Sequence, residues 1–159
     1  MSTPALRHQD SVDVAAPPEA VYDLVSDVTR TGEWSVQCHA CEWADPDQAG
    51  RVGAVFTGHN RTGDREWSTR STVVAADRPT RFAWEVGAGF VRWTYDVEET
   101  AGGSRLTHTW EFLPAGLDFF ATTYGETADA EIAQRSEAAR SGVPETLARL
   151  RGLLEGGRD

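Results

Sequence analysis

The sequence has no lysine, so all 15 of its basic side chains are arginines. This absence excludes a Schiff-base lysine and the lysine of a phosphate-binding P-loop. Basic groups are also outnumbered, because 25 acidic side chains oppose them and the formal net charge is −10. Nucleic acids and anionic membranes attract clustered positive charge, so neither is an expected partner.

Long apolar runs are missing as well. No stretch approaches the roughly 18 apolar residues of a membrane-spanning helix, and residues 1–8 lack the apolar run of a secretory signal. We therefore expect a cytoplasmic protein without membrane insertion. The sequence also lacks the motifs of serine hydrolases, P-loop nucleotide hydrolases, dinucleotide-dependent dehydrogenases and zinc proteases, so those reactions have no support.

Cysteine is scarce, since the chain has only Cys38 and Cys41. Two thiols are too few for a disulfide scaffold, and they supply only half of the ligands of a structural zinc site. On a regular strand, residues three apart point to opposite faces with Cα atoms about 10 Å apart, which forbids a disulfide. A thioredoxin-like redox pair would need a following helix, which the sequence does not indicate. We therefore predict no metal, no redox role, no other cofactor and a packing role for both thiols.

What the chain does have is enough apolar sequence for a core. It is 159 residues long, 40% of them apolar, and it contains six tryptophans. No internal repeat or linker divides it, so a single domain over residues 1–159 is expected, with an ordered core at 8–155.

The spacing of apolar residues changes along the chain. A short strand is predicted at 11–14, then a helix that begins near Pro17 and ends before Thr31. Alternating residues follow, and they predict strands at 36–44, 52–60, 65–76, 80–86, 90–98 and 104–112. The turns between these strands are too short for parallel crossovers, so the sheet is expected to be antiparallel, with one apolar and one charged face.

Beyond the strands, apolar residues recur three or four apart from Phe120 to Leu154, which predicts a long amphipathic helix. Pro144 removes a backbone donor within it, so we expect a kink or break at 142–144. Because one helix cannot cover so many strands, the sheet is expected to curl around it and leave a pocket.

Several short segments carry a resemblance to a known family. They are residues 14–23 (Val-Ala-Ala-Pro-Pro-Glu-Ala-Val-Tyr-Asp), Gly32-Glu-Trp34, Val52-Gly53 with Phe56, Trp67-Ser-Thr69, and Arg92-Trp-Thr-Tyr95 before Gly102-Gly-Ser-Arg-Leu-Thr107. With the order of elements, they resemble the START-like (SRPBCC, helix-grip) superfamily, and within it the polyketide cyclase/dehydrase-like proteins.

This resemblance implies an α+β helix-grip fold. Such a fold has a curved antiparallel sheet of about seven strands around a long C-terminal helix, with two short helices between the first two strands. It implies no single function, because the superfamily includes lipid carriers, cyclases, hormone receptors and co-chaperones.

The inner face of the predicted sheet supplies the candidate site. His108 lies there between Leu106 and Trp110, either as a polar group in an apolar pocket or as a core histidine bonded to Tyr95 or a backbone carbonyl. Of the other histidines, His59 is predicted to face outward and His8 to lie near a strand edge. The predicted ligand-binding residues are Phe56, Asn60, Trp67, Thr69, Ser71, Phe82, Trp84, Trp93, Tyr95, His108, Trp110, Phe120 and Tyr124. Some of these rings could instead simply fill the core.

Four functions fit these observations. The first is the binding of a hydrophobic, aromatic or polycyclic small molecule between the sheet and the C-terminal helix. The second is a polyketide aromatase/cyclase-like enzyme, in which His108 and Tyr95 would move protons at substrate carbonyls. The others are a resistance protein that sequesters a natural product and a co-chaperone-like interaction module.

Overall fold

The computed structural model describes residues 5–156. Its strands are β1 (Arg7–Val14), β2 (Cys38–Trp43), β3 (Val55–Thr62), β4 (Arg65–Asp77), β5 (Arg81–Val86), β6 (Val91–Thr100) and β7 (Gly103–Phe112). Its helices are α1 (Pro18–Val25), α2 (Pro114–Tyr124) and α3 (Ala128–Gly156), with short 3₁₀ turns η1 (Val28–Glu33), η2 (Pro46–Gln48) and η3 (Gly125–Thr127).

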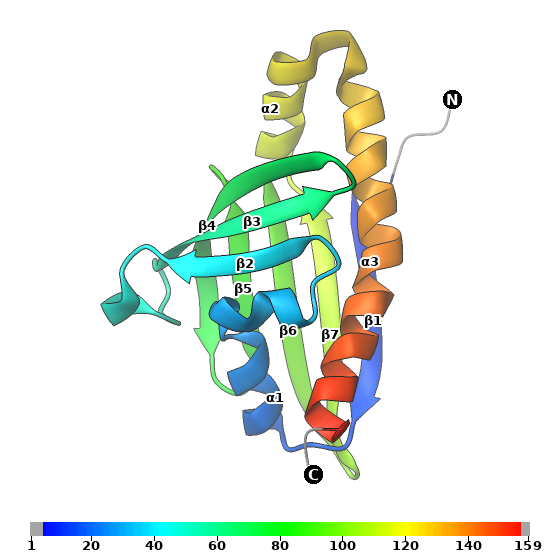
Figure 1. Cartoon of the computed structure of the whole chain (residues 1–159). Helices are drawn as coiled ribbons and strands as arrows, with labels where there is room; N and C mark the ends of the chain where they lie inside the picture. Colours follow the sequence, from blue (N-terminus) through cyan, green and yellow to red (C-terminus); the bar gives the residue numbers. More distant parts are fainter. Residues whose placement is uncertain (1–4, 157–159) are drawn as a thin grey trace.

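The seven strands form one antiparallel sheet in the order β1-β7-β6-β5-β4-β3-β2, so the first strand pairs with the last (Figure 1). All the predicted strands are confirmed, although the first begins at Arg7 rather than at residue 11. The helix α1 and the turn η1 are the two short helices expected between the first strands. The chain thus has the predicted helix-grip architecture.

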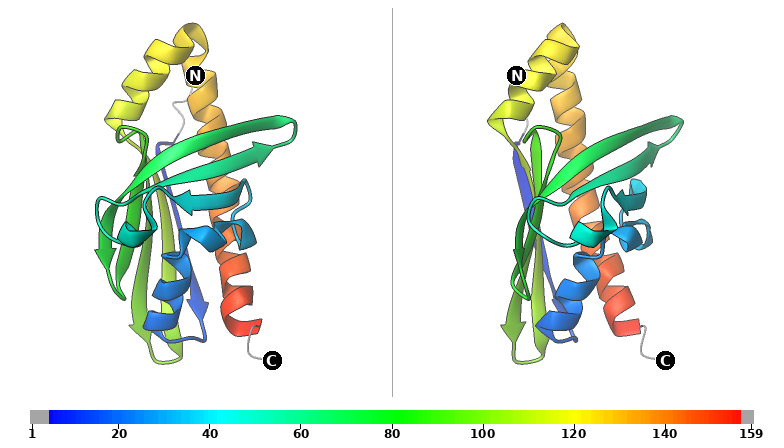
Figure 2. Two further views of the ribbon diagram at one scale, coloured as in Figure 1. Left: turned by 60° about the vertical axis from the view of Figure 1, so that its left-hand side comes forward. Right: turned by 90° about the vertical axis from the view of Figure 1, so that its left-hand side faces the viewer.

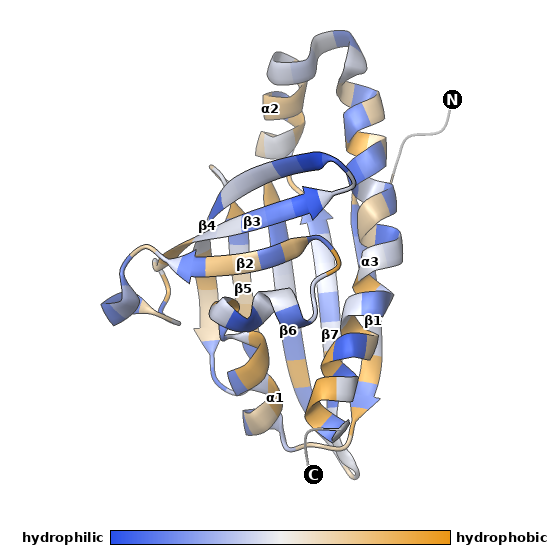
Figure 3. Ribbon diagram, viewed as in Figure 1, coloured by the Kyte–Doolittle hydropathy of each residue, from blue (hydrophilic) through white to orange (hydrophobic). Residues whose placement is uncertain are grey.

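The sheet is strongly curved, because the β3–β4 hairpin runs in a different direction from strands β5–β7. In Figure 2, the β3–β4 hairpin leaves the plane of β5–β7 and extends across α3. The register of β4 against β5 shifts between Val73 and Ala75, and such a bulge bends a strand and increases its twist. The turn that joins β3 to β4 at the far end of this hairpin is hydrophilic (Figure 3).

Two buried clusters hold the fold together. The larger joins the inner face of β1, β6 and β7 to α1 and α3, and includes Val21, Leu106, Leu147 and Leu150. The smaller cluster lies between α1 and β3–β5 and consists of Tyr22, Val28, Ala54, Phe56, Val73 and Phe82. Between these clusters the curled sheet is only partly filled by side chains.

The break in the C-terminal helical segment is not where the sequence predicted it. α3 is continuous through Pro144, and the interruption lies at Gly125, whose positive φ of 54° ends α2. Pro144 removes one hydrogen bond, to the carbonyl of Arg140, but Arg140 is exposed and water can replace the lost donor. Buried Val143 and Leu147 on either side keep the helix packed against the sheet.

Candidate functional site

A cavity of about 460 Å³ lies between the inner face of the sheet and α2, α3 and η1. Its walls contain five of the six tryptophans, namely Trp34, Trp67, Trp84, Trp93 and Trp110. The volume falls within the range of natural small-molecule sites, roughly 300–1,000 Å³. The aromatic residues therefore shape a hollow as well as a core.

The structure brings together twelve of the thirteen predicted residues along this wall. They are Phe56, Asn60, Trp67, Thr69, Ser71, Trp84, Trp93, Tyr95, His108, Trp110, Phe120 and Tyr124. They come from strands β3 to β7 and from α2, so residues distant in sequence share one surface.

Phe82 is the exception, because it does not line the cavity. It is 0% exposed, and its ring packs nearly perpendicular to that of Tyr22 from α1, with centroids 6.3 Å apart. Phe82 and Trp84 share the inner face of β5, as the alternation predicted. The end of β5 nearer Phe82, however, is covered by α1, which the pattern of one strand does not show.

Sequence reasoning also missed several wall residues. Trp34, which is only 2% exposed, belongs to a segment that carries the family resemblance, but it is not among the predicted ligand-binding residues. Phe90 was not predicted either, and its ring stacks on Phe119 of α2 with centroids 4.3 Å apart, which joins the β5–β6 turn to α2 at the cavity. An aromatic residue directly after a glycine-rich turn was the available signal for Phe90.

His108 fits both predictions, because it is a polar group of the pocket and is also bonded to a backbone carbonyl. Its ring lines the cavity and is stacked on Tyr95, and its Nδ1 lies 3.2 Å from the carbonyl oxygen of Thr94. Because a carbonyl can only accept, Nδ1 donates and Nε2 remains as the acceptor of the ring. Burial lowers the pKa of His108 to about 4, so the imidazole is neutral near neutral pH.

Tyr95 is protonated for the same physical reason. Burial raises the pKa of its phenol above the ordinary value, and a side-chain hydrogen bond with Trp34 acts in the opposite direction. The wall therefore presents uncharged groups that make hydrogen bonds: a histidine acceptor and a tyrosine hydroxyl.

The charged residues of the wall are all of one sign. Arg70 and Arg135 line the cavity, and within residues 5–156 no aspartate or glutamate does so. The guanidinium of Arg135 lies 5.5 Å from the ring centre of Phe120 and 3.1 Å from a carboxylate oxygen of Glu131. An acidic protein thus encloses a cavity whose wall carries positive charge.

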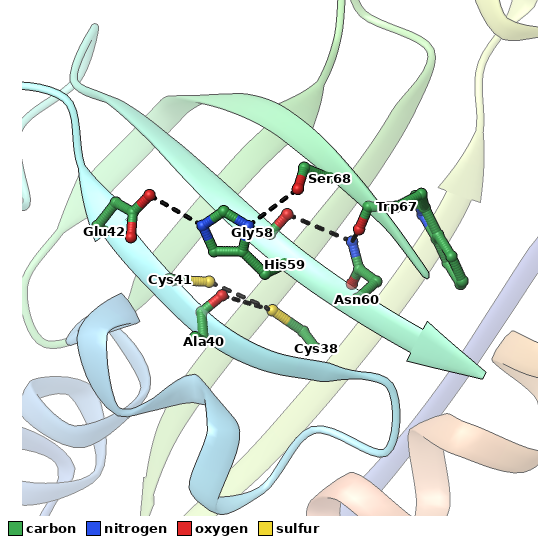
Figure 4. Close-up of polar contacts among 9 residues, drawn as sticks. All are labelled: Cys38, Ala40, Cys41, Glu42, Gly58, His59, Asn60, Trp67 and Ser68. Atoms are coloured by element: carbon green, nitrogen blue, oxygen red, sulfur yellow. Dashed lines mark hydrogen bonds and ion pairs between the residues drawn. The ribbon is translucent and has the colours of Figure 1, made fainter. Parts of the chain in front are cut away.

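The orientation of the two thiols differs from the sequence prediction, which placed them on opposite faces of a regular strand. The register of β2 against β3 shifts at His39, so Cys38 lies opposite Asn60 and Cys41 opposite Gly58. The extra residue of this bulge turns both thiols to the same face, with their Sγ atoms 3.3 Å apart (Figure 4). Both cysteines line the cavity.

The remaining histidines lie outside the cavity wall. His59 faces outward as predicted, with Nδ1 2.9 Å from Ser68 Oγ and Nε2 2.8 Å from Glu42 (Figure 4). His8 is not a plain edge residue, because its Nε2 lies 2.9 Å from Ser136 Oγ on α3 and its ring stacks on Trp110. His8 thus joins β1 to α3.

Neither a metal cluster nor a membrane span stands out in the described chain. In residues 5–156, no three histidine, cysteine, aspartate or glutamate side chains are grouped to hold a metal ion. Over the same residues, no helix is both long and apolar enough to cross a membrane.

Comparison with known proteins agrees with this architecture. Residues 6–150 match the sequence model of a family described as polyketide cyclase/dehydrase and lipid transport. The chain belongs to this family. A polyketide cyclase-like protein of Corynebacterium glutamicum, Cgl2372, is 46% identical, with a TM-score of 0.71 over 96% of this chain and 93% of that one. A comparison with curated proteins finds no match.

Two further solved structures with the same fold come from biosynthetic pathways. The di-domain aromatase/cyclase StfQ of steffimycin biosynthesis is 15% identical, with a TM-score of 0.67 over 96% of this chain and 51% of that one. The di-domain aromatase/cyclase BexL of BE-7585A biosynthesis is 21% identical, with a TM-score of 0.65 over 94% and 50%. At these identities the likeness shows a shared fold, and this chain spans about half of either protein.

Proposed function

We propose that this protein binds a hydrophobic, aromatic or polycyclic small molecule between its sheet and its C-terminal helix. The observation that carries the proposal is the cavity of about 460 Å³ walled by five tryptophans. Stacking on these rings and burial of apolar area would supply most of the affinity. The twelve predicted wall residues are the proposed ligand contacts.

The polar groups of the wall indicate which substituents such a ligand carries. Arg70 and Arg135 favour anionic or carbonyl oxygens, and Asn60, Thr69 and Ser71 add neutral hydrogen-bonding groups. Nε2 of His108 can accept a hydrogen bond from a hydroxyl group. The proposed ligand is therefore an aromatic body with hydroxyl and carbonyl or acidic oxygens.

An aromatase/cyclase-like reaction in the same cavity is the second candidate. The family description and the fold of StfQ and BexL favour it. Against it, His108 is a weak base and Tyr95 a weak acid, because burial moves both pKa values away from neutrality. Any turnover would rest mainly on confinement and orientation of the chain, so we place binding first.

The other two functions have less support. Sequestration of a reactive natural product would use the same cavity and would appear as tight binding without turnover. A co-chaperone-like role needs an exposed apolar patch. The exposed large apolar side chains of the described chain are Val36, Val52, Val74 and Phe119, and two of them, Val36 and Phe119, belong to the cavity wall.

The test begins with native mass spectrometry of freshly purified protein, followed by solvent extraction of any bound compound. A co-purifying aromatic mass, or a raised melting temperature with hydroxylated polycyclic compounds, is the expected result. Phe119→Ala should weaken that binding, whereas Val52→Ala, 64% exposed and outside the wall, should not. An empty protein that no such compound stabilises would contradict the proposal.

A further inference from the structure

The pair Cys38 and Cys41 has a geometry that packing alone does not require. Their partners on β3, Asn60 and Gly58, are two residues apart, which corresponds to about 6.6 Å between Cα atoms along a strand. Cysteines joined by a disulfide have Cα atoms roughly 4.4–6.8 Å apart. The bulge at His39 therefore sets the backbone at a spacing that a disulfide can bridge.

The side chains are already oriented toward each other. Their Sγ atoms lie 3.3 Å apart, and a bond would bring them to about 2.05 Å. Gly58 faces the pair from β3, where an added Cβ would lie 3.4 Å from Sγ of Cys38 and 3.5 Å from Sγ of Cys41. With no side chain at that position, the sulfurs have room for the small rotation that closes the bond.

The environment also assigns different roles to the two thiols. The hydrogen bond from the Cys41 thiol lowers the pKa of Cys38 to about 7, while the same bond and burial raise the pKa of Cys41. Cys38 is therefore the thiolate that attacks, and Cys41 is the thiol that follows. Both cysteines are only partly buried and line the cavity, so a small oxidant can reach them.

We propose that Cys38 and Cys41 are an oxidisable dithiol in the cavity wall, which closes to an intramolecular disulfide on reaction with a hydroperoxide. The Cys38 thiolate attacks one peroxide oxygen, the O–O bond breaks, and Cys38 becomes a sulfenic acid as hydroxide leaves and is protonated. Cys41 then attacks the Cys38 sulfur, its proton leaves with the displaced hydroxyl group as water, and the S–S bond forms. With hydrogen peroxide, two thiols and one peroxide give one disulfide and two waters.

This proposal does not depend on the nature of the ligand. The pair could respond to oxidant in an empty or an occupied cavity, although a ligand in contact with the same wall should slow the reaction. The chain has no other cysteine, so an internal disulfide can only join these two residues.

The test is intact-mass analysis of the reduced, full-length protein after treatment with hydrogen peroxide, without added reductant. We expect the loss of two hydrogen atoms, the disappearance of both reactive thiols, and full reversal by dithiothreitol. Trypsin cleaves after Arg30 and Arg51, so both cysteines fall in one peptide, and the oxidised peptide should stay unlinked to any other.

Single variants separate the two steps. In Cys41→Ser, peroxide should leave a sulfenic acid on Cys38 that dimedone traps, and no internal disulfide can form. In Cys38→Ser the bond to the Cys38 thiol is gone but burial still raises the pKa of Cys41, so this thiol should react more slowly than Cys38 does in Cys41→Ser. Disulfides between molecules, over-oxidation of one cysteine in the wild type, or no reaction would each overturn the proposal. These wild-type outcomes decide the matter even where a variant fails to fold.

Discussion

The imidazole of His108 stacks on the phenol of Tyr95, with ring centroids 4.1 Å apart and ring planes 11° from parallel. Trp93 stacks on the same imidazole with a centroid distance of 5.1 Å. These rings come from neighbouring positions on β6 and β7, where Tyr95 pairs with His108. An uncharged polar group is thus fixed in an aromatic wall.

Replacement of His108 by phenylalanine should weaken the binding of hydroxylated ligands without unfolding the protein. Phenylalanine keeps the stacked ring but removes the Nε2 acceptor, and one hydrogen bond is worth about 1 kcal/mol, or roughly fivefold in affinity. A suitable comparison is a hydroxylated anthraquinone against anthraquinone itself, measured by quenching of tryptophan fluorescence. Equal losses for both compounds in His108→Phe would remove His108 from ligand recognition.

Stability should fall with acidity because of the same histidine. The pKa of His108 is lowered from 6.5 to about 4 in the folded state, so the unfolded chain binds more protons between these values. The stabilisation is complete above about pH 6.5, declines as the pH falls, and is lost below about pH 4, a total of about 3 kcal/mol.

Urea unfolding at a series of pH values measures this dependence. In His108→Phe the free energy of unfolding should depend less on pH between about pH 6.5 and about pH 4, because phenylalanine at position 108 does not titrate. The exposed carboxyls whose pKa values are lowered by arginine partners, such as Glu33 beside Arg30, should act in both proteins alike. An identical slope in wild type and variant would show that His108 is not the group responsible.

Addition of one methyl group at Gly116 should loosen α2. A Cβ there would lie 2.3 Å from the carbonyl oxygen of Phe90 and 2.9 Å from the ring of Phe112. Relief of that contact must move α2 away from the β5–β6 turn, and such overpacking typically costs about 1–3 kcal/mol.

The matched control is Gly152→Ala, on α3, where an added Cβ meets nothing within 4 Å. It should be neutral or stabilise by about 0.5–1 kcal/mol through helix propensity. Thermal unfolding of the two variants checks both values. If Gly116→Ala is as stable as Gly152→Ala, α2 is not held against Phe90 as described.

Arg135→Gln should reduce the binding of anionic aromatic probes. Arg135 contributes positive charge to a wall that also includes Phe120. Its loss should lower the affinity for 1-anilinonaphthalene-8-sulfonate a few-fold, or by about 1 kcal/mol. Binding of uncharged pyrene should be unchanged. Arg140→Gln, which breaks a similar pair with Glu137 on α3 outside the cavity wall, serves as the control for net charge.

The comparison must be made at one ionic strength, because salt screens partly exposed charges. Equal weakening of probe binding by Arg135→Gln and Arg140→Gln would mean that the overall charge matters rather than this position. If Arg135→Gln weakens pyrene binding and the control variant does not, Arg135→Gln changes the shape of the cavity instead.

Much of this architecture was determined by the sequence itself. Side chains of a strand alternate with a period of two, so the pattern Trp93, Tyr95, Val97 and Leu106, His108, Trp110 already placed these residues on one inner face. The same period of two predicted ten strand residues that the structure does bring to the cavity wall, and helical spacing predicted Phe120 and Tyr124 there. Local spacing is sufficient here because it reports which face a side chain occupies.

Only the tertiary structure decided what packs against each part of that inner face. Phe82 and Trp84 share a face of β5, but α1 covers one and the cavity borders the other. The break at Gly125 rather than at Pro144 depends on packing of α3 against the sheet. The thiols meet because a bulge at His39 adds one residue to β2, and strand parity beyond a bulge is reversed. A bulge is fixed by pairing with the neighbouring strand, so the spacing of residues along one segment does not reveal it.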